Sequence, residues 1–261
     1  MRVPVSILIA AVIAFIFLGL IVAGQSRAEL DINSVKGGWL LDEGAGEEAT
    51  DASRHRNVGS LKNRPEWVEG KYGKALMFDG DGAHVEIPHE KSLDVKDEFS
   101  IVFWMTANLI PPGGTTRTLV TKNKWEVTID NGTIRFFLNP KNEVCCERLW
   151  GITALNVDTW YHVACTYNNK HMIMYIDGVF DGSREASGDI SSTQDIHIGH
   201  DVDLHGAGGF FDVILDEVIL FDVAITEDDV NSLMNDSAAL LLPVSPSGKL
   251  ATAWGRIKKQ E

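Results

Sequence analysis

Paired carboxylates are the first chemistry to look for, because two of them facing one cleft can hydrolyse a glycosidic bond as nucleophile and acid/base. On one strand they have to stand at alternating positions to reach the same face. No Glu-x-Asp-x-Glu or Glu-x-Asp-x-x-Glu string occurs in the sequence. Asp216 and Glu217 are adjacent, so a regular strand would point them to opposite faces. The sequence therefore predicts no catalytic residues and no enzyme, with a glycosidase or lyase using carboxylates from different strands as the alternative.

Other catalytic and metal-binding patterns are also missing. The sequence contains no His-Glu-x-x-His, no phosphate-binding Gly-x-x-x-x-Gly-Lys-Ser/Thr and no Gly-x-Ser-x-Gly. The eight histidines are interpreted as scattered rather than spaced as ligands, and His162 as structural. Asp201 and Asp203, beside His200 and His205 in a Gly-rich segment, form one candidate ligand-binding site, with a solvated loop as the alternative.

A sugar-binding site would need an exposed aromatic platform beside hydrogen-bonding groups. Trp150 is the predicted surface aromatic, with Arg148 beside it as a ligand-binding residue. Further candidates for exposed aromatics are Trp125, Phe210 and Phe211. Strand-like patterns assign three others to the core, namely Trp39, Trp104 and Trp160.

Length and composition favour one large domain. The chain has 261 residues, of which 44% are hydrophobic, enough for a sizeable core. Its formal net charge is −14. Such an acidic surface repels phosphate backbones, so we expect no nucleic-acid partner. Acidity also fits divalent cations, although solubility alone explains it.

The first 28 residues have the three parts of a secretory signal. Arg2 precedes an apolar run from residue 5 to residue 23, and Ser26 and Ala28 stand at −3 and −1 of a possible cut before Glu29. The run is near the ~20 residues that span a bilayer, so an uncleaved signal anchor is the alternative. In either case we expect the domain to be secreted or membrane-anchored on the extracytoplasmic side. Residues 29–239 are predicted to form that domain. Residues 240–261 are predicted to form a basic tail, which either binds a partner or a membrane surface or is a loosely packed terminus.

Three cysteines do not make a disulfide framework. Cys145 and Cys146 are adjacent, and Cys165 lies in a strand-like run. One bridge from the pair to Cys165 and unpaired thiols both remain open. A cysteine zinc site is not predicted, because no Cys-x-x-Cys pair exists.

From residue 75 onwards the sequence predicts strand after strand, separated by Gly, Asp and Asn turns. Asp130-Asn131-Gly132 is typical of a tight hairpin turn. The run FSIVFWM is apolar on both faces, which predicts a central, covered strand. One helix is expected, capped by Thr226 with Asp229 at the capping-box position. Many short strands at near-regular spacing favour an all-β antiparallel sandwich with one short C-terminal helix.

Four motifs in order resemble a known family over roughly residues 36 to 235. They read GKALMFDG, WYHVACTY, MYIDG and LDEVILFDVAIT. The chain thus resembles the laminin-G-like jelly-roll domains of the concanavalin A-like lectin/glucanase superfamily. The resemblance implies two curved antiparallel sheets of six to seven strands, and binding of sugars, proteins or calcium.

The resemblance also implies that the loop after the first strand, the Phe-Asp-Gly turn and the last strand meet at one edge of the fold. Asp51, Asp79, Asp81 and Asp216 are then the expected ligands of a structural calcium ion, since calcium prefers carboxylate and carbonyl oxygens. The alternative is that Asp79 and Asp81 only make turn hydrogen bonds. Together, these observations predict an exported, non-catalytic module that binds a glycan or an extracellular protein. A purely structural assembly domain is the remaining alternative.

Overall fold

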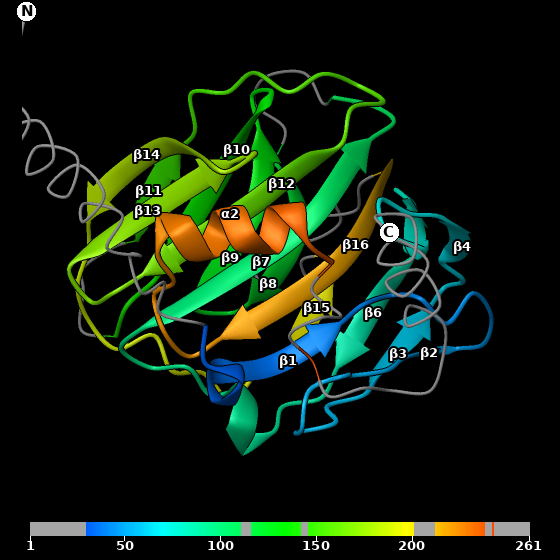
Figure 1. Ribbon diagram of the computed structural model, residues 1–261, viewed down its shortest axis with the longest axis horizontal. Coiled ribbons are helices and arrows are strands. Elements are labelled where there is room, and N and C mark those ends of the chain that lie inside the picture. The colour runs from blue at the N-terminus through cyan, green and yellow to red at the C-terminus, as the bar shows by residue number, and fades with distance from the viewer. Residues whose placement is uncertain (1–29, 111–115, 142–145, 201–211, 238–241, 243–261) are drawn as a thin grey trace, which may run out of the picture.

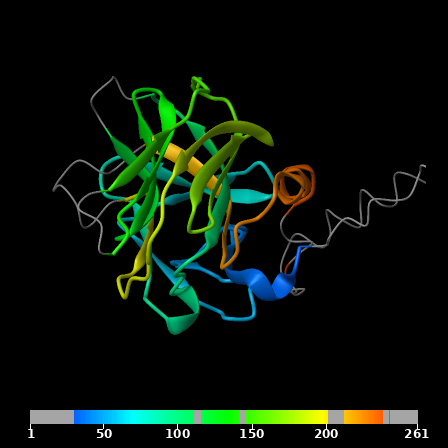
Figure 2. The same cartoon turned by 90° about the vertical axis from the view of Figure 1, so that its left-hand side faces the viewer.

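The computed structural model describes residues 30–110, 116–141, 146–200, 212–237 and 242. In this part of the chain two sheets of eight strands each stack face to face, and every strand pair is antiparallel (Figure 1 and Figure 2). The all-β sandwich predicted from the sequence is therefore confirmed. Each sheet has eight strands rather than the six or seven expected.

Sheet 1 runs in the order β14-β13-β12-β7-β16-β5-β4, and β1 pairs with β16 beside this path. Its strands are β1 (Val35–Trp39), β4 (Glu66–Glu69), β5 (Lys74–Asp79), β7 (Phe99–Ala107), β12 (Tyr161–Tyr167), β13 (His171–Ile176), β14 (Val179–Glu185) and β16 (Asp212–Phe221).

Sheet 2 runs in the order β11-β10-β9-β8-β15-β6-β3-β2. Its strands are β2 (Glu48–Ala49), β3 (Gly59–Lys62), β6 (His84–Ile87), β8 (Arg117–Lys122), β9 (Trp125–Asp130), β10 (Thr133–Leu138), β11 (Glu147–Trp150) and β15 (Ile196–Ile198). Within the described ranges, the remaining elements are two short 3-10 turns, Ile32–Ser34 and Lys91–Leu93, and one helix.

Alternation along the strands builds the core between the sheets. In β9, Trp125, Val127 and Ile129 are fully buried and face the inner side. In β7 all nine residues are buried, because the outer face of sheet 1 is covered as well as the inner one. The prediction of a central, covered strand is confirmed.

The helix α2 (Glu227–Asn235) covers the outer face of sheet 1 (Figure 1). Its buried Val230 and Leu233 belong to a second apolar cluster with Val102, Ile219 and Phe221 of the sheet. The predicted capping box is present: Thr226 Oγ1 accepts from the Asp229 backbone N–H at 3.2 Å, and Asp229 Oδ2 accepts from that of Thr226 at 2.9 Å.

The expected signal segment and most of the basic tail lie outside the described residues. Among the residues that are described, no helix is both long and apolar enough to cross a bilayer. Strands β2, β3 and β4 were not predicted, because the segment 40–70 shows no clear apolar alternation.

Candidate functional site

The outer face of sheet 2 carries a polar row that crosses five strands in register. Glu126 of β9 pairs with Thr121 of β8, Thr121 with His197 of β15, His197 with Glu86 of β6, and Glu86 with Ser60 of β3. Glu126, His197 and Glu86 stand on the outer face because both strand neighbours of each belong to the core, and Thr121 and Ser60 are their register partners. This face therefore holds carboxylates, hydroxyls and imidazole where sheet 1 holds an apolar layer under α2.

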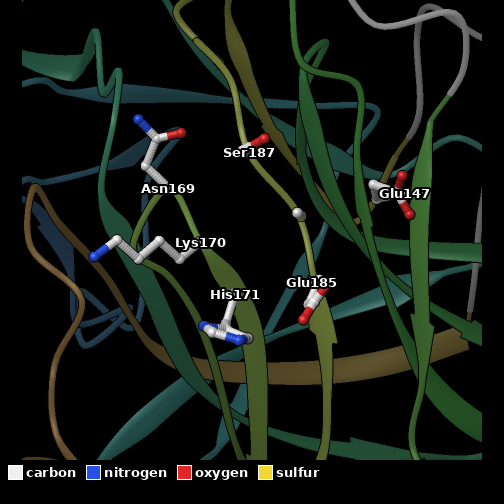
Figure 3. A pocket seen from close by; sticks show the side chains of 7 residues that line it. Glu147, Asn169, Lys170, His171, Glu185 and Ser187 are labelled. Carbon is white, nitrogen blue, oxygen red and sulfur yellow. The ribbon is translucent and has the colours of Figure 1, made fainter.

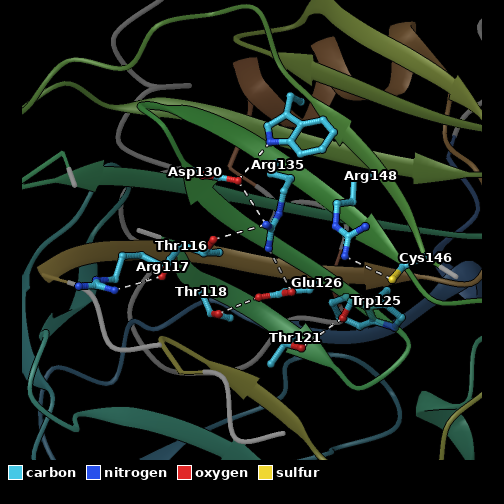
Figure 4. Close-up of polar contacts among 11 residues, drawn as sticks. Thr116, Arg117, Thr118, Thr121, Trp125, Glu126, Asp130, Arg135, Cys146 and Arg148 are labelled. Carbon is cyan, nitrogen blue, oxygen red and sulfur yellow. Dashed lines mark hydrogen bonds and ion pairs between the residues drawn. The ribbon is translucent and has the colours of Figure 1, made fainter. Parts of the chain in front are cut away.

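At one end of this face a single guanidinium joins two carboxylates, as Figure 4 shows. Arg135 Nη2 lies 3.6 Å from Glu126 Oε2, and Arg135 Nη1 lies 3.3 Å from Asp130 Oδ2. Thr118 Oγ1 donates to Glu126 Oε1 at 2.9 Å. Only 4% of Glu126 is exposed, and a carboxylate this buried needs such partners. The network fixes the carboxylates as rigid hydrogen-bond acceptors.

Trp150 and Arg148 stand beside this network on β11. Trp150 is 47% exposed, and its indole N–H donates to Asp130 Oδ2 at 3.2 Å. Arg148 places its guanidinium carbon 5.3 Å from the centre of the Phe137 ring. Among the described residues no carboxylate forms an ion pair with Arg148. The surface tryptophan predicted from the sequence is thus exposed, and the arginine predicted with it lies on the same face.

At the other end of the polar face, several histidines lie close together, although the sequence analysis interprets the histidines as scattered. His84 and Glu86 of β6 and His197 of β15 offer ligand atoms that all lie within 4.8 Å of one another. The His200 ring centre lies 5.0 Å from that of His84 and 6.4 Å from that of His197. That interpretation is wrong for these residues. The alternation His-Val-Glu-Ile and Ile-His-Ile was the available signal, because it puts polar side chains on one face of two strands.

A shallow pocket of about 460 Å³ lies at a different place, where β11 approaches the β13–β14 hairpin (Figure 3). Asn169, Lys170 and His171 form one side, and Glu147, Glu185, Ala186 and Ser187 complete the lining. Arg184 forms an ion pair with Glu147 next to it. None of the described residues that line the pocket is a Trp, Tyr or Phe, so they offer no broad platform on which a sugar ring would stack.

The predicted calcium ligands do not meet at one point. Asp51 is 6% exposed, and its two carboxylate oxygens accept four hydrogen bonds, from the backbone N–H groups of Gly38, Ser53 and Asn57 and from the Ser53 hydroxyl, at 2.7–2.8 Å. Asp79 Oδ1 accepts from the backbone N–H groups of Asp81 and Ala83.

Asp216 lies in the middle of β16 rather than at its start. Asp79 pairs with Asp212, four residues from Asp216, which is roughly 13 Å along the strand. Only Asp79 and Asp81 share a turn. The calcium ion stays a prediction.

Asp216 and Glu217 also differ from the expected alternation. A β-bulge lies between Asp216 and Ile219, and Glu217 has a φ of 52°. Asp216 Oδ2 accepts from the Tyr72 backbone N–H at 2.8 Å, and Glu217 accepts from the Ser237 hydroxyl beyond α2. Both carboxylates thus reach the helix-covered side. They are 0% and 2% exposed, so the covering segments keep both away from any open cleft.

The remaining predictions have mixed outcomes. Trp125, one of the candidates for an exposed aromatic, is fully buried. Cys165 is a free, fully buried thiol, so the possible bridge from the cysteine pair to Cys165 is absent, and burial raises the pKa of the Cys165 thiol. The other candidates lie outside the described residues. They are Cys145, Asp201, Asp203, His205, Phe210 and Phe211.

Several solved structures with a similar fold are binding domains of toxins. The binding domain of paraclostridial mosquitocidal protein 1 is similar with a TM-score of 0.66 and 16% identity, over 78% of this chain and 52% of that one. The binding domain of botulinum neurotoxin DC in complex with rat synaptotagmin II gives 0.59 and 16%, over 78% and 52%. This chain therefore spans about half the length of the toxin domains that it matches.

A third similar structure is domain 4 of a GH43 extracellular arabinanase from Geobacillus stearothermophilus, in complex with arabinotriose. It gives a TM-score of 0.62 and 16% identity, over 77% of this chain and 98% of that one. No curated protein sequence matches the chain. A family model, described as the concanavalin A-like lectin/glucanases superfamily, matches residues 79–231. This match covers more than half of the sequence, and it agrees with the sandwich described above. The chain belongs to the laminin G branch of the concanavalin A-like lectin/glucanases superfamily.

Proposed function

We propose that this protein is an exported, non-catalytic binding module that recognises a glycan with the outer face of sheet 2. The observation that carries the proposal is the half-exposed indole of Trp150, held by Asp130 next to Arg135 and Arg148. Sugar rings stack on aromatic faces, and their hydroxyls pair with fixed carboxylate and guanidinium groups. The hydrogen bond from Trp150 to Asp130 orients the ring in advance, which lowers the entropy cost of binding.

The same network argues against hydrolysis at this end of the face. A glycosidase needs room between its two carboxyl groups for the glycosidic oxygen, and for a water molecule or the sugar carbon. Arg135 occupies the space between Glu126 and Asp130, because it contacts both. Asp130, which is only partly buried, is therefore placed to accept a hydrogen bond from a ligand, while the buried Glu126 holds Arg135 in position.

The related structures support a binding role and leave two ligand classes. The arabinanase domain was solved with a sugar, arabinotriose, and one toxin domain with a protein, synaptotagmin II. We favour the glycan for this chain because Trp150 stands among polar groups. A protein ligand is the second candidate, since Leu109, Ile152 and Val157 also expose apolar surface, 58%, 82% and 47% respectively.

A glycan array followed by titration of the best ligand tests the proposal. We expect Trp150→Ala to weaken binding about tenfold or more, which corresponds to about 1.4 kcal/mol. Phe180→Ala is the matched control: Phe180 is also about half exposed, at 50%, but it belongs to β14 of sheet 1. The proposal fails if both variants bind like the wild type, or if the array gives no ligand and a protein is captured through Trp150 instead.

We also propose that a calcium ion binds the turn that carries Asp79 and Asp81. Both side chains are exposed and acidic, and they stand at the turn between β5 and β6. Thermal unfolding with calcium and with a chelator tests this proposal. A rise in Tm with calcium that Asp79→Asn removes would support it, and identical melting curves would contradict it.

Export is proposed from residues 1–28. Expression of the full chain, followed by cell fractionation and intact-mass measurement, distinguishes the two forms. A secreted protein that begins at Glu29 indicates cleavage, and a full-length membrane-bound protein indicates an anchor. A full-length protein in the cytoplasm would contradict export.

A further inference from the structure

We propose that His84, Glu86 and His197 form a binding site for a divalent transition metal of the zinc type, at the far end of the polar face from Trp150. The ligand atoms of these residues lie within 4.8 Å of one another. Imidazole nitrogens with one carboxylate oxygen are a donor set that zinc prefers over calcium or magnesium. The donors differ from those of the neighbouring turn, where Asp79 and Asp81 offer carboxylates alone, and the metal site does not depend on glycan binding.

The strand register brings these three side chains together. His84 and Glu86 are two residues apart on β6, so both point to the outer face. His197 is the cross-strand partner of Glu86 on β15, and it lies diagonally opposite His84. Both strands are held in the middle of sheet 2 by neighbours on each side, β3 and β8. The backbone therefore presents the donors from a rigid surface rather than from a loop.

A backbone carbonyl orients the first ligand. His84 Nδ1 lies 2.8 Å from the Gly82 carbonyl oxygen, and a carbonyl can only accept, so Nδ1 carries the proton. The lone pair then resides on Nε2, which is the nitrogen left to coordinate a metal. Histidines that bind metals commonly donate their other ring N–H in this way.

His200 is positioned as a fourth donor near the same point. Gly199 has a φ of 85°, and a Cβ there would lie 2.7 Å from a carbon of the Phe78 ring. Only glycine fits this turn, which directs the chain after β15 so that the His200 ring lies 5.0 Å from the His84 ring. The ligands of a tetrahedral zinc ion lie roughly 3.3 Å apart. Side-chain rotations that bring the donors of His84, Glu86 and His197 closer by up to about 1.5 Å, with the His200 ring turning in as the fourth ligand, would complete the coordination.

Lys62 competes with the metal for the carboxylate. Its Nζ lies 3.7 Å from Glu86 Oε1, and both side chains are partly exposed, at 41% and 37%. Such a pair contributes little stability, so an ion of higher charge can displace the lysine. Removal of this ammonium group should therefore raise the affinity of the site for a cation.

Competition between the protein and a chromogenic chelator for Zn²⁺ tests the proposal on the full chain, purified in mild detergent without a polyhistidine tag. We expect one Zn²⁺ per chain, and at least a hundredfold loss of affinity in the double variant His84→Ala/His197→Ala. His171→Ala is the control, because His171 is an exposed histidine of sheet 1. Glu86→Gln keeps the shape of a half-buried side chain, so it tests the metal site even if the double variant does not fold. We expect this variant to lose about tenfold in affinity for Zn²⁺.

Two further measurements make the test more specific. Lys62→Met should bind Zn²⁺ several-fold more tightly than the wild type. Co²⁺ in place of Zn²⁺ should give the visible absorption of a four-coordinate nitrogen and oxygen site, and this absorption should vanish in the double variant. The proposal is overturned if the double variant and Glu86→Gln bind Zn²⁺ as tightly as the wild type, or if the wild type binds none.

Discussion

The two outer faces of the sandwich have opposite characters. On sheet 1, Ile219 and Phe221 lie under Val230 and Leu233 of α2, and this apolar layer is covered together with a few buried polar groups, among them Asp216. On sheet 2, Glu126, Arg135 and His197 occupy the corresponding layer, held by ion pairs and hydrogen bonds. Burial of apolar surface stabilises a fold, whereas fixed polar groups recognise a ligand. On the proposed function, the first face contributes stability and the second carries the binding site.

The largest expected effect is on the covered face. Phe221 is 0% exposed in the apolar layer beneath α2, so Phe221→Ala should lower the free energy of unfolding by about 3–5 kcal/mol. Urea denaturation measures the loss. Below the unfolding transition the variant should bind its ligand with wild-type affinity, because sheet 2 is untouched. A variant that stays folded but loses affinity would show that the two faces are not separate.

The covered face also holds an imidazole that should make it sensitive to acid. His162 packs against Trp104, with ring centres 5.0 Å apart, and burial together with the nearby Lys71 charge lowers its pKa from 6.5 to about 3. Between these values the unfolded chain binds a proton that the folded chain refuses, so stability falls as pH drops below 6.5.

His162→Gln should remove this slope. From pH 7 to pH 4.5 the wild type should lose about 2–3 kcal/mol more of its free energy of unfolding than the variant does. Urea denaturation of both proteins at the two pH values measures the difference. Parallel losses in the two proteins would contradict the assignment of a neutral, buried His162.

Two substitutions that each remove one exposed aromatic ring test the role of the outer face of sheet 2. Trp150→Ala should cost about tenfold in glycan affinity but less than about 0.5 kcal/mol in stability, because the indole is half exposed. Phe180→Ala on sheet 1 should leave affinity unchanged. Ligand titration gives the affinity of each variant, and urea denaturation gives its free energy of unfolding. A large stability loss in Trp150→Ala with unchanged affinity would reverse the role assigned to this residue.

The smallest expected effect concerns the cap of the covering helix. Thr226→Ala removes one half of the capping box and should cost about 1 kcal/mol. The change is measurable as a lower urea midpoint with an unchanged slope. Thr226→Ser, which keeps the hydroxyl, is the control and should stay close to the wild type. Equal losses in the two variants would mean that the hydroxyl is not what stabilises the helix start.

Local signals in the sequence predicted much of the sandwich. The Asp130-Asn131-Gly132 turn and the alternating run after it define β10 with its observed bounds, Thr133–Leu138. Thr226 and Asp229 likewise predict the start of α2. The bulge at Glu217 was not predictable, because it places a non-glycine residue in the left-handed region. The short strands β2 and β4 have no apolar alternation of their own, and each is defined by its pairing with the next strand along the chain, β3 and β5 respectively.

The candidate sites were predicted only in part, for the same physical reason. Trp150 was named correctly as an exposed aromatic, but the same reasoning also named Trp125, which the sandwich buries completely. The cluster of His84, Glu86 and His197 depends on the register between strands more than a hundred residues apart in sequence. The four hydrogen bonds that the Asp51 carboxylate accepts depend on a loop conformation that no sequence motif predicts.

Hydrogen–deuterium exchange with and without the best ligand from the array tests the central claim most directly, because it locates the contact without a mutation. The outer face of sheet 2 is assigned as the binding surface, so added protection is predicted in residues 126–137 and 147–150. No change is expected in residues 219–235, which form the covered face. Protection confined to α2 and β16 would contradict the account.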